Sequence, residues 1–287
     1  MHIAFIGLGN MGGAICQHLT RAQHQVRVFD LSTQALEAAR AHGAEPCQSL
    51  AQALTQAELV FTSLPSPADV TSVALDPGGI ATNARPGAIH VDLSTNAPAA
   101  VAQIGKDLAA SDIEMLDAPV SGGVFGAQRG QLTIMVGGAP ATFERALPVL
   151  DTFARSVTHV GPLGSGTIAK LVNNLIACNN VASAAEAFRL GTAAGMDPQI
   201  LDNVIRNSSG DSVMYRAVAR KFLSADWSAN FALDLAAKDM ALVQALAQQL
   251  DTPLPIGTQT SALLDMASSL GFGQDDIAAL LRVNETP

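Results

Sequence analysis

Short apolar runs rich in β-branched residues alternate with alanine-rich helical stretches over about the first 161 residues. This alternation predicts an α/β fold with a mostly parallel, doubly wound sheet, whose crossover helices cover both faces. The runs that we expect to form strands cover residues 2–6, 25–29, 59–64, 88–93, 113–120, 132–136 and 157–160. Functional loops in such a sheet follow the carboxyl ends of the strands, so chemically important residues are expected there.

The strand pattern ends near Gly164, and the rest of the chain shows helical periodicity. We predict helices over residues 168–195, 198–207, 213–223, 233–250, 257–270 and 275–283. The fourth of these carries an apolar stripe formed by Met240, Val243, Leu246 and Leu250. Another helix or another subunit must cover this stripe. The change of pattern predicts two domains, at residues 1–163 and 164–287, with a long helix at about 167–194 between them.

The composition indicates a folded, acidic, globular protein. Of the 287 residues, 48% are hydrophobic and only 14% are charged, which excludes an intrinsically disordered chain. The formal net charge of -9 has the wrong sign for a protein that holds a phosphate backbone through a broad surface. Nucleic acid is therefore not expected as a partner.

Cysteine and histidine spacing predicts neither a disulfide framework nor a metal site. Cys16, Cys47 and Cys178 form an odd, widely spaced set, which indicates a reducing compartment. The six histidines include no pair three or four residues apart, so we expect no bound metal. Segment 171–185 is uncharged but contains four asparagines and is shorter than the roughly 20 apolar residues of a membrane span. Because the N-terminus also lacks a basic leader, we expect a soluble, cytoplasmic protein without a membrane partner.

A glycine-rich motif follows the first expected strand directly. It matches the pattern G-x-G-x-x-G and consists of Gly7, Leu8, Gly9, Asn10, Met11 and Gly12. In a dinucleotide-binding turn, Gly7 allows the tight turn, Gly9 lets the backbone approach a pyrophosphate, and Gly12 lets the helix pack on the strand. The alternative is an ordinary strand-to-helix turn. The strand, the helix and a following acidic residue together favour dinucleotide binding.

That acidic residue is Asp30, at the end of the second expected strand. Its carboxylate can accept hydrogen bonds from the adenosine ribose hydroxyls of NAD and would repel the 2′-phosphate of NADP. No arginine follows at residues 31–33 to offset the repulsion. We therefore expect NAD as the cofactor, with NADP less favoured.

Two later strand ends carry hydroxyl groups and glycines. After the fourth expected strand, Ser94 or Thr95 can cap the next helix, or direct a hydroxyl toward a cofactor; capping alone is the simpler interpretation. The fifth expected strand leads into Ser121, Gly122 and Gly123, whose backbone N–H groups can form a nest around a carboxylate. A plain glycine turn explains this second motif equally well.

The helical half contributes two candidate pairs. Lys170 and Asn174 lie four residues apart on the predicted long helix and share one face. Because nearby residues are uncharged, burial can lower the pKa of Lys170 and allow proton exchange near neutral pH; a lysine that extends from a core helix to solvent is the competing interpretation. Lys238 and Asp239 are adjacent on a helix and do not face each other, so we expect no local ion pair between them.

Together and in this order, the motifs resemble those of the β-hydroxyacid dehydrogenases, the 3-hydroxyisobutyrate dehydrogenase family. The matching segments, spread over nearly the whole chain, are 7–12, 92–95, 117–123, 164–166, Lys170 with Asn174, and 238–239. The resemblance implies a Rossmann domain followed by an all-α C-terminal domain for substrate binding and oligomerisation, with the active site in the cleft between them. It also implies hydride transfer between NAD and a small β-hydroxy acid, such as 3-hydroxyisobutyrate, or its semialdehyde.

The resemblance assigns roles by position. Lys170 would be the general acid/base, and Asn174 would orient the lysine and the substrate. The residues that would bind the substrate carboxylate are Ser121, Gly122 and Gly123. Beyond the glycine turn and Asp30, the residues that would contact the cofactor are Leu64, Pro65, Thr95 and Lys238.

Several alternatives remain. A short-chain dehydrogenase needs a tyrosine four residues before a lysine, and the only tyrosine, Tyr215, has Ala219 in that position. Reduction of tartronate semialdehyde (2-hydroxy-3-oxopropionate) or a related aldehyde-acid is the nearest alternative. Imine reductases and non-catalytic dinucleotide-binding scaffolds share the architecture but usually lack the lysine that is present here as Lys170.

Substrate size and assembly are further expectations. No arginine adjoins the Ser121 or Lys170 segments, although Arg129 and Arg206 can approach in three dimensions. A small monocarboxylate is therefore favoured over a phosphate or dicarboxylate. The apolar stripes on the C-terminal helices, together with the resemblance, predict a homodimer or homotetramer.

Overall fold

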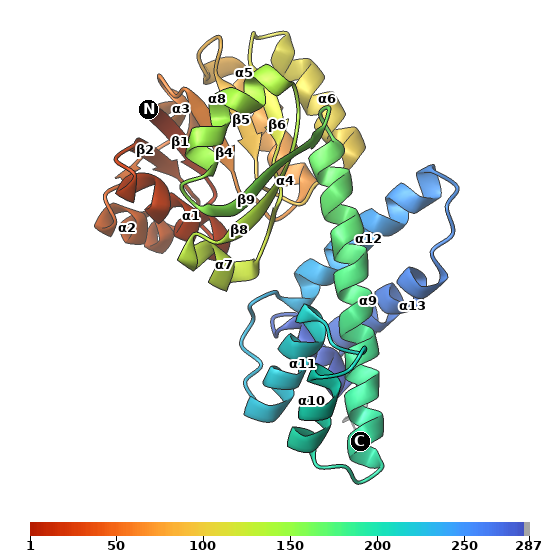
Figure 1. Cartoon of the computed structure of the whole chain (residues 1–287). Helices are drawn as coiled ribbons and strands as arrows, with labels where there is room; N and C mark the ends of the chain where they lie inside the picture. The colour runs from red at the N-terminus through yellow and green to blue at the C-terminus, as the bar shows by residue number, and fades with distance from the viewer. Residues whose placement is uncertain (284–287) are drawn as a thin grey trace. The chain divides into compact units, whose positions relative to one another are not determined.

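The computed structural model describes residues 1–283, so the last four residues of the predicted domain 164–287 lie outside the described part. The chain divides into two compact units, the first covering Met1–Lys170 and the second beginning at Leu171 (Figure 1). Each unit has hydrophobic core residues of its own.

The first unit is built on a mostly parallel sheet, which confirms the α/β prediction. Its strands in the described chain are β1 (His2–Ile6), β2 (Gln25–Phe29), β3 (Glu45–Pro46), β4 (Leu59–Thr62), β5 (Ile89–Asp92), β6 (Glu114–Asp117), β7 (Val120–Ser121), β8 (Leu132–Gly137) and β9 (Ala154–Gly161). They lie in the order β3-β2-β1-β4-β5-β6-β8-β7, and β9 pairs with β8. Strand β8 is antiparallel to β6 and β7, whereas the other pairings are parallel.

The strand order reverses beside β1. Strands β2 and β3 extend from β1 in one direction, and β4, β5 and β6 extend in the other. Open parallel sheets bind ligands outside the carboxyl ends of the strands at such a reversal. Gly7 follows the last residue of β1 and therefore lies at this point.

Three strand predictions need correction. Residues 113–120, predicted as one strand, form β6 and the separate β7, because Pro119 has no N–H to donate and interrupts the ladder. The pattern missed β3, whose two residues are too few to show alternation and include Pro46. Strand β9 begins at Ala154, before the predicted start at Val157, because its parallel pairing with β8 already begins there.

Helices cover both faces of the sheet, as right-handed crossovers require. They are α1 (Asn10–Arg21), α2 (Thr33–Ala41), α3 (Leu50–Leu54), α4 (Pro67–Leu75), α5 (Ile80–Asn83), α6 (Pro98–Ala109), α7 (Gly123–Arg129) and α8 (Pro140–Leu150). Alternate residues of β1 enter two different cores: Phe5 packs with Ile15 of α1, whereas Ala4 and Ile6 belong to the core that contains Ile104 of α6.

The second unit is helical, as the sequence predicts. Helix α9 (Ser165–Ala193) begins within the first unit and continues into the second. The elements that follow it are α10 (Pro198–Arg206), α11 (Val213–Ser224), α12 (Leu233–Gln249), α13 (Pro255–Ala267), the π turn η1 (Ser268–Phe272) and the 3-10 helix η2 (Ile277–Arg282). Met240 and Val243 of the predicted stripe on α12 are buried in this unit's core, but Leu250 is exposed.

The C-terminal helices differ from prediction in two places. The helix expected over 257–270 ends as an α-helix at Ala267 and continues as η1, where Gly271 has a φ of +91°. Segment 275–283, expected as an α-helix, forms the shorter 3-10 helix η2, whose start is capped by Asp276. Within residues 1–283, no helix combines the length and the apolar character needed to cross a membrane.

Candidate active site

The glycine-rich turn connects β1 to α1. Gly7 has a φ of +92°, and a Cβ there would overlap the carbonyl oxygen of Ser63. A Cβ on Gly12 would overlap the carbonyl oxygen of Gly7, so α1 and the turn make backbone contact. At Gly9, by contrast, a Cβ would meet no described atom within 4 Å. Gly7 and Gly12 thus close the turn, and Gly9 leaves an open backbone surface for a ligand.

The start of α1 has the features of an anion site. The helix begins at Asn10, Gly9 is its N-cap, and no described side chain caps it. Its first turn contains no acidic residue. Its leading N–H groups and the positive end of its dipole therefore suit a pyrophosphate. This donor set fits a dinucleotide.

Asp30 fixes the same turn from the neighbouring strand. One carboxylate oxygen accepts a hydrogen bond from the Leu8 N–H at 2.6 Å, and the other accepts from the Ser32 N–H at 2.7 Å. The side chain is half-buried, so lone pairs remain at the surface for ribose hydroxyls. Asp30 therefore has a structural task in addition to the predicted cofactor contact.

The loops after β4 and β5 are tied to each other. The Leu64 N–H donates to Ser94 Oγ at 2.9 Å, and Leu64 precedes Pro65, another predicted cofactor contact. Ser94 in turn precedes the half-buried Thr95. The predicted cofactor contacts on these two loops therefore lie on neighbouring strand ends, because β4 and β5 pair in parallel.

The prediction that Ser94 or Thr95 caps the next helix is wrong. Helix α6 begins at Pro98, its N-cap is Ala97, and no side chain in the described chain caps it. The Ser94 hydroxyl already accepts a hydrogen bond from the Leu64 N–H, and three residues separate Ser94 from the start of the helix.

A buried polar cluster lies beneath these loops. Asp92 accepts hydrogen bonds from Thr62 Oγ1 at 2.9 Å and from Asn96 Nδ2 at 3.0 Å. His90 Nε2 lies 2.9 Å from Thr62 Oγ1, and His90 Nδ1 has no hydrogen-bond partner among the described residues. Burial lowers the pKa of His90 to about 4, although nearby Asp92 opposes that shift. The imidazole is therefore neutral at physiological pH.

The candidate carboxylate nest joins β7 to α7. Gly122 has a φ of +135° and is the N-cap of α7, and Gly123 has a φ of +61°. Both φ values lie in the left-handed region that favours glycine, so the backbone of this turn depends on the two glycines. Ser121, the last residue of β7, is half-buried beside them.

Asp117 holds the start of the helix that carries Lys170. Its carboxylate accepts hydrogen bonds from the Gly164 N–H at 2.8 Å and the Thr167 N–H at 2.6 Å. Burial raises the pKa of Asp117, and these hydrogen bonds oppose the shift. Lys170 is half-buried, one turn further along α9.

In the second unit, Asn174 is connected to the Lys238–Asp239 pair. Asn174 Nδ2 donates to Asp239 Oδ2 at 2.6 Å, and Lys238 Nζ lies 3.0 Å from Asp239 Oδ1. The prediction of no ion pair between these adjacent residues is therefore wrong. Their Cβ atoms diverge on the helix, but the long lysine side chain reaches back to the carboxylate, which is buried.

Several supporting residues had no assigned role in the sequence-based prediction. Asp92 and Asp117 occupy paired positions at the ends of β5 and β6, and Asp239 is the partner of Asn174. For Asp92 and Asp117, the available signal was an acidic residue at the end of a strand. The hydrogen-bond partners of these three residues lie 2 to 65 residues away along the chain, and the sequence does not specify such pairs.

The sheet order, the open glycine turn and the acidic end of β2 define the first unit as a dinucleotide-binding domain of the Rossmann type. Residues 2–161 match a family model described as the NAD binding domain of 6-phosphogluconate dehydrogenase. Residues 164–284 match one described as NAD-binding of NADP-dependent 3-hydroxyisobutyrate dehydrogenase. The chain belongs to the β-hydroxyacid dehydrogenase family, a family of oxidoreductases.

Individual relatives agree with this placement over almost the full length. A 2-(hydroxymethyl)glutarate dehydrogenase from Eubacterium barkeri is 37% identical over 99% of this chain and 94% of the relative. An NAD-dependent L-serine dehydrogenase from Pseudomonas aeruginosa is 34% identical over 98% of this chain and 97% of its own. A crystal structure of 3-hydroxyisobutyrate dehydrogenase from Salmonella typhimurium superposes with a TM-score of 0.91 at 31% identity, covering 99% of both chains.

Proposed function

We propose that this protein oxidises a small monocarboxylic β-hydroxy acid to its semialdehyde with NAD, and reduces the semialdehyde in the reverse direction. The observation that carries the proposal is Lys170, four residues before Asn174 on α9, in a chain of this family. A helix places such a pair on one face, within reach of one substrate. Because Lys170 is present, imine reduction and a non-catalytic scaffold are not favoured.

Each candidate residue has a chemical task in this proposal. Lys170 accepts the hydroxyl proton of the substrate, and in reverse it stabilises the developing alkoxide and protonates it. Asn174 orients the substrate and the lysine. NAD, when bound, accepts the hydride from the carbinol carbon. The substrate carboxylate is bound by Ser121, Gly122 and Gly123, and Thr95 and Lys238 contact the cofactor.

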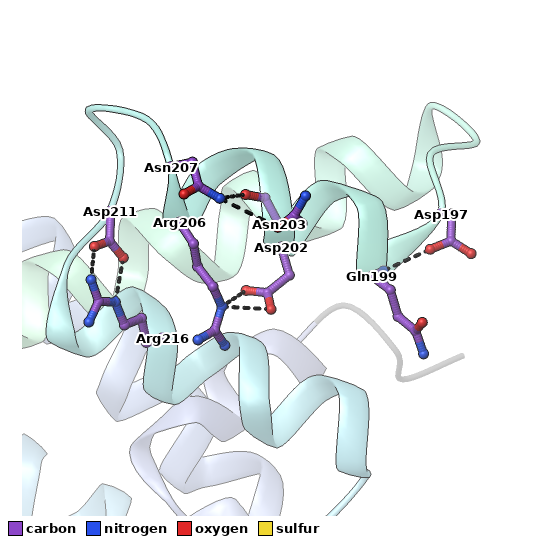
Figure 2. A network of polar contacts seen from close by, with 8 residues as sticks. All are labelled: Asp197, Gln199, Asp202, Asn203, Arg206, Asn207, Asp211 and Arg216. Carbon is purple, nitrogen blue, oxygen red and sulfur yellow. Dashed lines mark hydrogen bonds and ion pairs between the residues drawn. The ribbon is translucent and has the colours of Figure 1, made fainter.

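Arg129 and Arg206, which could have bound a second acidic group of the substrate, are poorly placed to do so. Arg129 is the last residue of α7, at the opposite end from Gly123. Arg206 Nε donates to both carboxylate oxygens of Asp202, at 2.8 and 2.7 Å (Figure 2). These placements support a monocarboxylate such as 3-hydroxyisobutyrate, with tartronate semialdehyde as the nearest alternative.

The test is a panel of hydroxy acids with NAD and with NADP, followed by absorbance of the reduced cofactor. The panel contains 3-hydroxyisobutyrate, 3-hydroxypropionate, L-serine, L-threonate and 2-(hydroxymethyl)glutarate. We expect the highest kcat/KM with a monocarboxylate and NAD. A clear preference for the dicarboxylate would overturn the proposed substrate class, and a panel without turnover would overturn the proposed reaction.

Lys170→Ala tests the proposed proton transfer. General acid/base catalysis contributes about 100- to 10,000-fold, so kcat is expected to fall by that order while NADH binding, measured by fluorescence, is retained. Lys106→Ala, at an exposed position on α6, is the matched control. Wild-type turnover by the Lys170→Ala protein would refute the assignment.

Asp30→Arg tests the proposed preference for NAD. The substitution removes the carboxylate that suits ribose hydroxyls and introduces a cation that suits a 2′-phosphate. We expect the ratio of NADPH to NADH affinity to rise. Tighter binding of NADPH than of NADH by the unsubstituted protein would contradict the role of Asp30.

We also propose a cytoplasmic homodimer or homotetramer assembled through the helical unit. Leu190, Ile200 and Val204 of the helical unit are 74%, 60% and 50% exposed, and a second subunit would cover such side chains. Buried thiols at Cys16 and Cys47 support a reducing location. Light scattering at micromolar concentration is expected to show at least a dimer, and a monomer would contradict the proposal.

A further inference from the structure

One carboxylate connects the sheet of the first unit to the helix that carries the proposed general base. Asp117 ends β6 and is only 1% exposed. Its two oxygens are divided between two backbone donors, Oδ1 with the Gly164 N–H and Oδ2 with the Thr167 N–H. These N–H groups belong to the turn before α9 and to its first turn, which have no intrahelical acceptors. Asp117 therefore acts as an N-cap supplied by a distant strand.

The backbone around Asp117 leaves no room for adjustment. A Cβ on Gly166 would overlap the carbonyl oxygens of both Asp117 and Met135. A Cβ on Gly137, at the end of β8, would overlap Asp117 Oδ1 and lie 2.8 Å from the Gly166 nitrogen. The first turn of α9 thus rests directly on β6 and β8. The glycines allow this approach, and the carboxylate determines where along the strands the helix begins.

Asp117 lies near two parts of the proposed site. It is close along the chain to the proposed carboxylate nest, and close in space to the start of α9, which carries Lys170. Directly after Asp117, Ala118 and Pro119 connect β6 to β7 and Ser121, the start of the proposed carboxylate nest. On α9, the Thr167 N–H that it holds is one helical turn before Lys170. A helix is stiff over one turn, so the position of the first turn sets the position of the lysine.

We propose that Asp117 is a positioning residue that fixes Lys170 relative to the carboxylate nest at Ser121, Gly122 and Gly123. It acts through the start of α9 and does not touch the substrate. Its negative charge also complements the positive end of the α9 dipole, which further stabilises the position of the first turn of α9. The inference rests on the proposed function, because it assumes that Lys170 exchanges the proton and that the nest holds the carboxylate.

The test compares Asp117→Ala and Asp117→Asn in the full-length protein with the best substrate of the panel. Alanine removes both acceptors, so we expect kcat to fall at least tenfold while the NADH dissociation constant changes less than twofold. Asparagine keeps one acceptor oxygen in the same shape and is expected to recover part of kcat. An unchanged kcat in the alanine variant would overturn the proposal and leave the proposed function intact.

Asp276→Asn is the matched control for general loosening of the fold. Asp276 is another buried carboxylate that accepts backbone N–H bonds, from Asn230 and Ala278 in the second unit. Its substitution is expected to lower the melting temperature to a similar extent and to leave kcat per folded molecule within twofold. A loss of kcat as large as that of Asp117→Asn would show a nonspecific effect and overturn the positioning role.

Hydrogen exchange measured by mass spectrometry tests the contact between Asp117 and the start of α9 even if no substrate in the panel is turned over. We expect the peptide that spans residues 162–170 to exchange at least tenfold faster in Asp117→Ala than in the wild type or Asp276→Asn. Faster exchange in Asp117→Ala, without turnover of any substrate, would support the role of Asp117 in holding the start of α9 and would reject the proposed reaction. Equal exchange in all three proteins would overturn the inference directly.

Discussion

The two units hold their candidate site residues in different ways. In the first unit, close backbone contacts at strand ends fix the loops, as with Gly12 against Gly7 and Gly166 against β6 and β8, and buried or half-buried carboxylates add hydrogen bonds to the same backbone. In the second unit, side chains fix one another, because Asn174 is held by Asp239. A backbone contact has no flexible group that can move aside, whereas a side-chain contact can be lost one hydrogen bond at a time. Substitutions should therefore have abrupt effects in the first unit and graded effects in the second.

Gly12→Ala is expected to have the largest effect. The added methyl group would overlap the Gly7 carbonyl oxygen, so the turn or α1 must shift, at a cost of about 3 kcal/mol. Gly9→Ala is the control, because its Cβ enters open space; it should leave the melting temperature unchanged and weaken NADH binding. Thermal denaturation and NADH fluorescence measure the two effects. Equal stability of both variants would contradict the backbone argument.

A loss of stability of comparable size is expected between pH 6.5 and 4, from a histidine of the first unit. All six histidines precede Leu171, and buried His90 has its pKa lowered from 6.5 to about 4. Below pH 6.5 the unfolded state therefore binds the proton more readily than the folded state. Stability should fall as pH falls from 6.5 to 4, by about 3 kcal/mol, since one pKa unit corresponds to about 1.4 kcal/mol.

Urea denaturation of His90→Gln measures this contribution. Glutamine can keep an N–H donor near Thr62 but does not titrate, so the variant should lose less stability between pH 6.5 and 4 than the wild type does. The exposed His42→Gln is the control and should follow the wild type. An identical pH dependence in all three proteins would show that His90 does not carry the effect.

A smaller effect is expected from the side-chain cluster of the second unit. The hydrogen bond from Asn174 to the charged Asp239 should give a coupling energy of about 2 kcal/mol in a double-mutant cycle of alanine variants. Asn173, which donates to Asn174 Oδ1 at 3.1 Å, is the control residue. Its coupling to Asp239 should be close to zero. A coupling of zero for Asn174 would mean that the contact does not stabilise the fold.

The smallest effect belongs to a surface pair of the second unit. Arg206 and Asp202 form an i, i+4 ion pair on α10, with side chains that are 40% and 13% exposed (Figure 2). Such a pair contributes about 0.5 kcal/mol and is screened by salt. Arg206→Gln should therefore lower stability slightly in low salt and not at all in 1 M salt. A loss that persists at high salt would indicate a contact other than the ion pair.

The sequence predicted the features that depend on local pattern. Alternation located most strands of the sheet, and G-x-G-x-x-G located the turn after β1 because its meaning depends on a strand, a turn and a helix in succession. Predictions were weaker where one residue overrides a pattern, as Pro119 does between β6 and β7. The capping contacts and side-chain pairs of the site could not be predicted from the sequence. The hydrogen bonds of Asp117 with Gly164 and Thr167, for example, depend on the arrangement of the sheet.

The two hydrogen bonds that Asp30 accepts, from the Leu8 and Ser32 N–H groups, limit how the cofactor preference can be redesigned. A substitution of Asp30 that is chosen to admit a 2′-phosphate also releases the glycine-rich turn, which is expected to bind the pyrophosphate. Asp30→Arg alone should therefore shift the preference and weaken both cofactors. An engineered or evolving variant that keeps tight cofactor binding would also need another acceptor for the Leu8 N–H, so a change in specificity without a loss of affinity requires at least two coordinated substitutions.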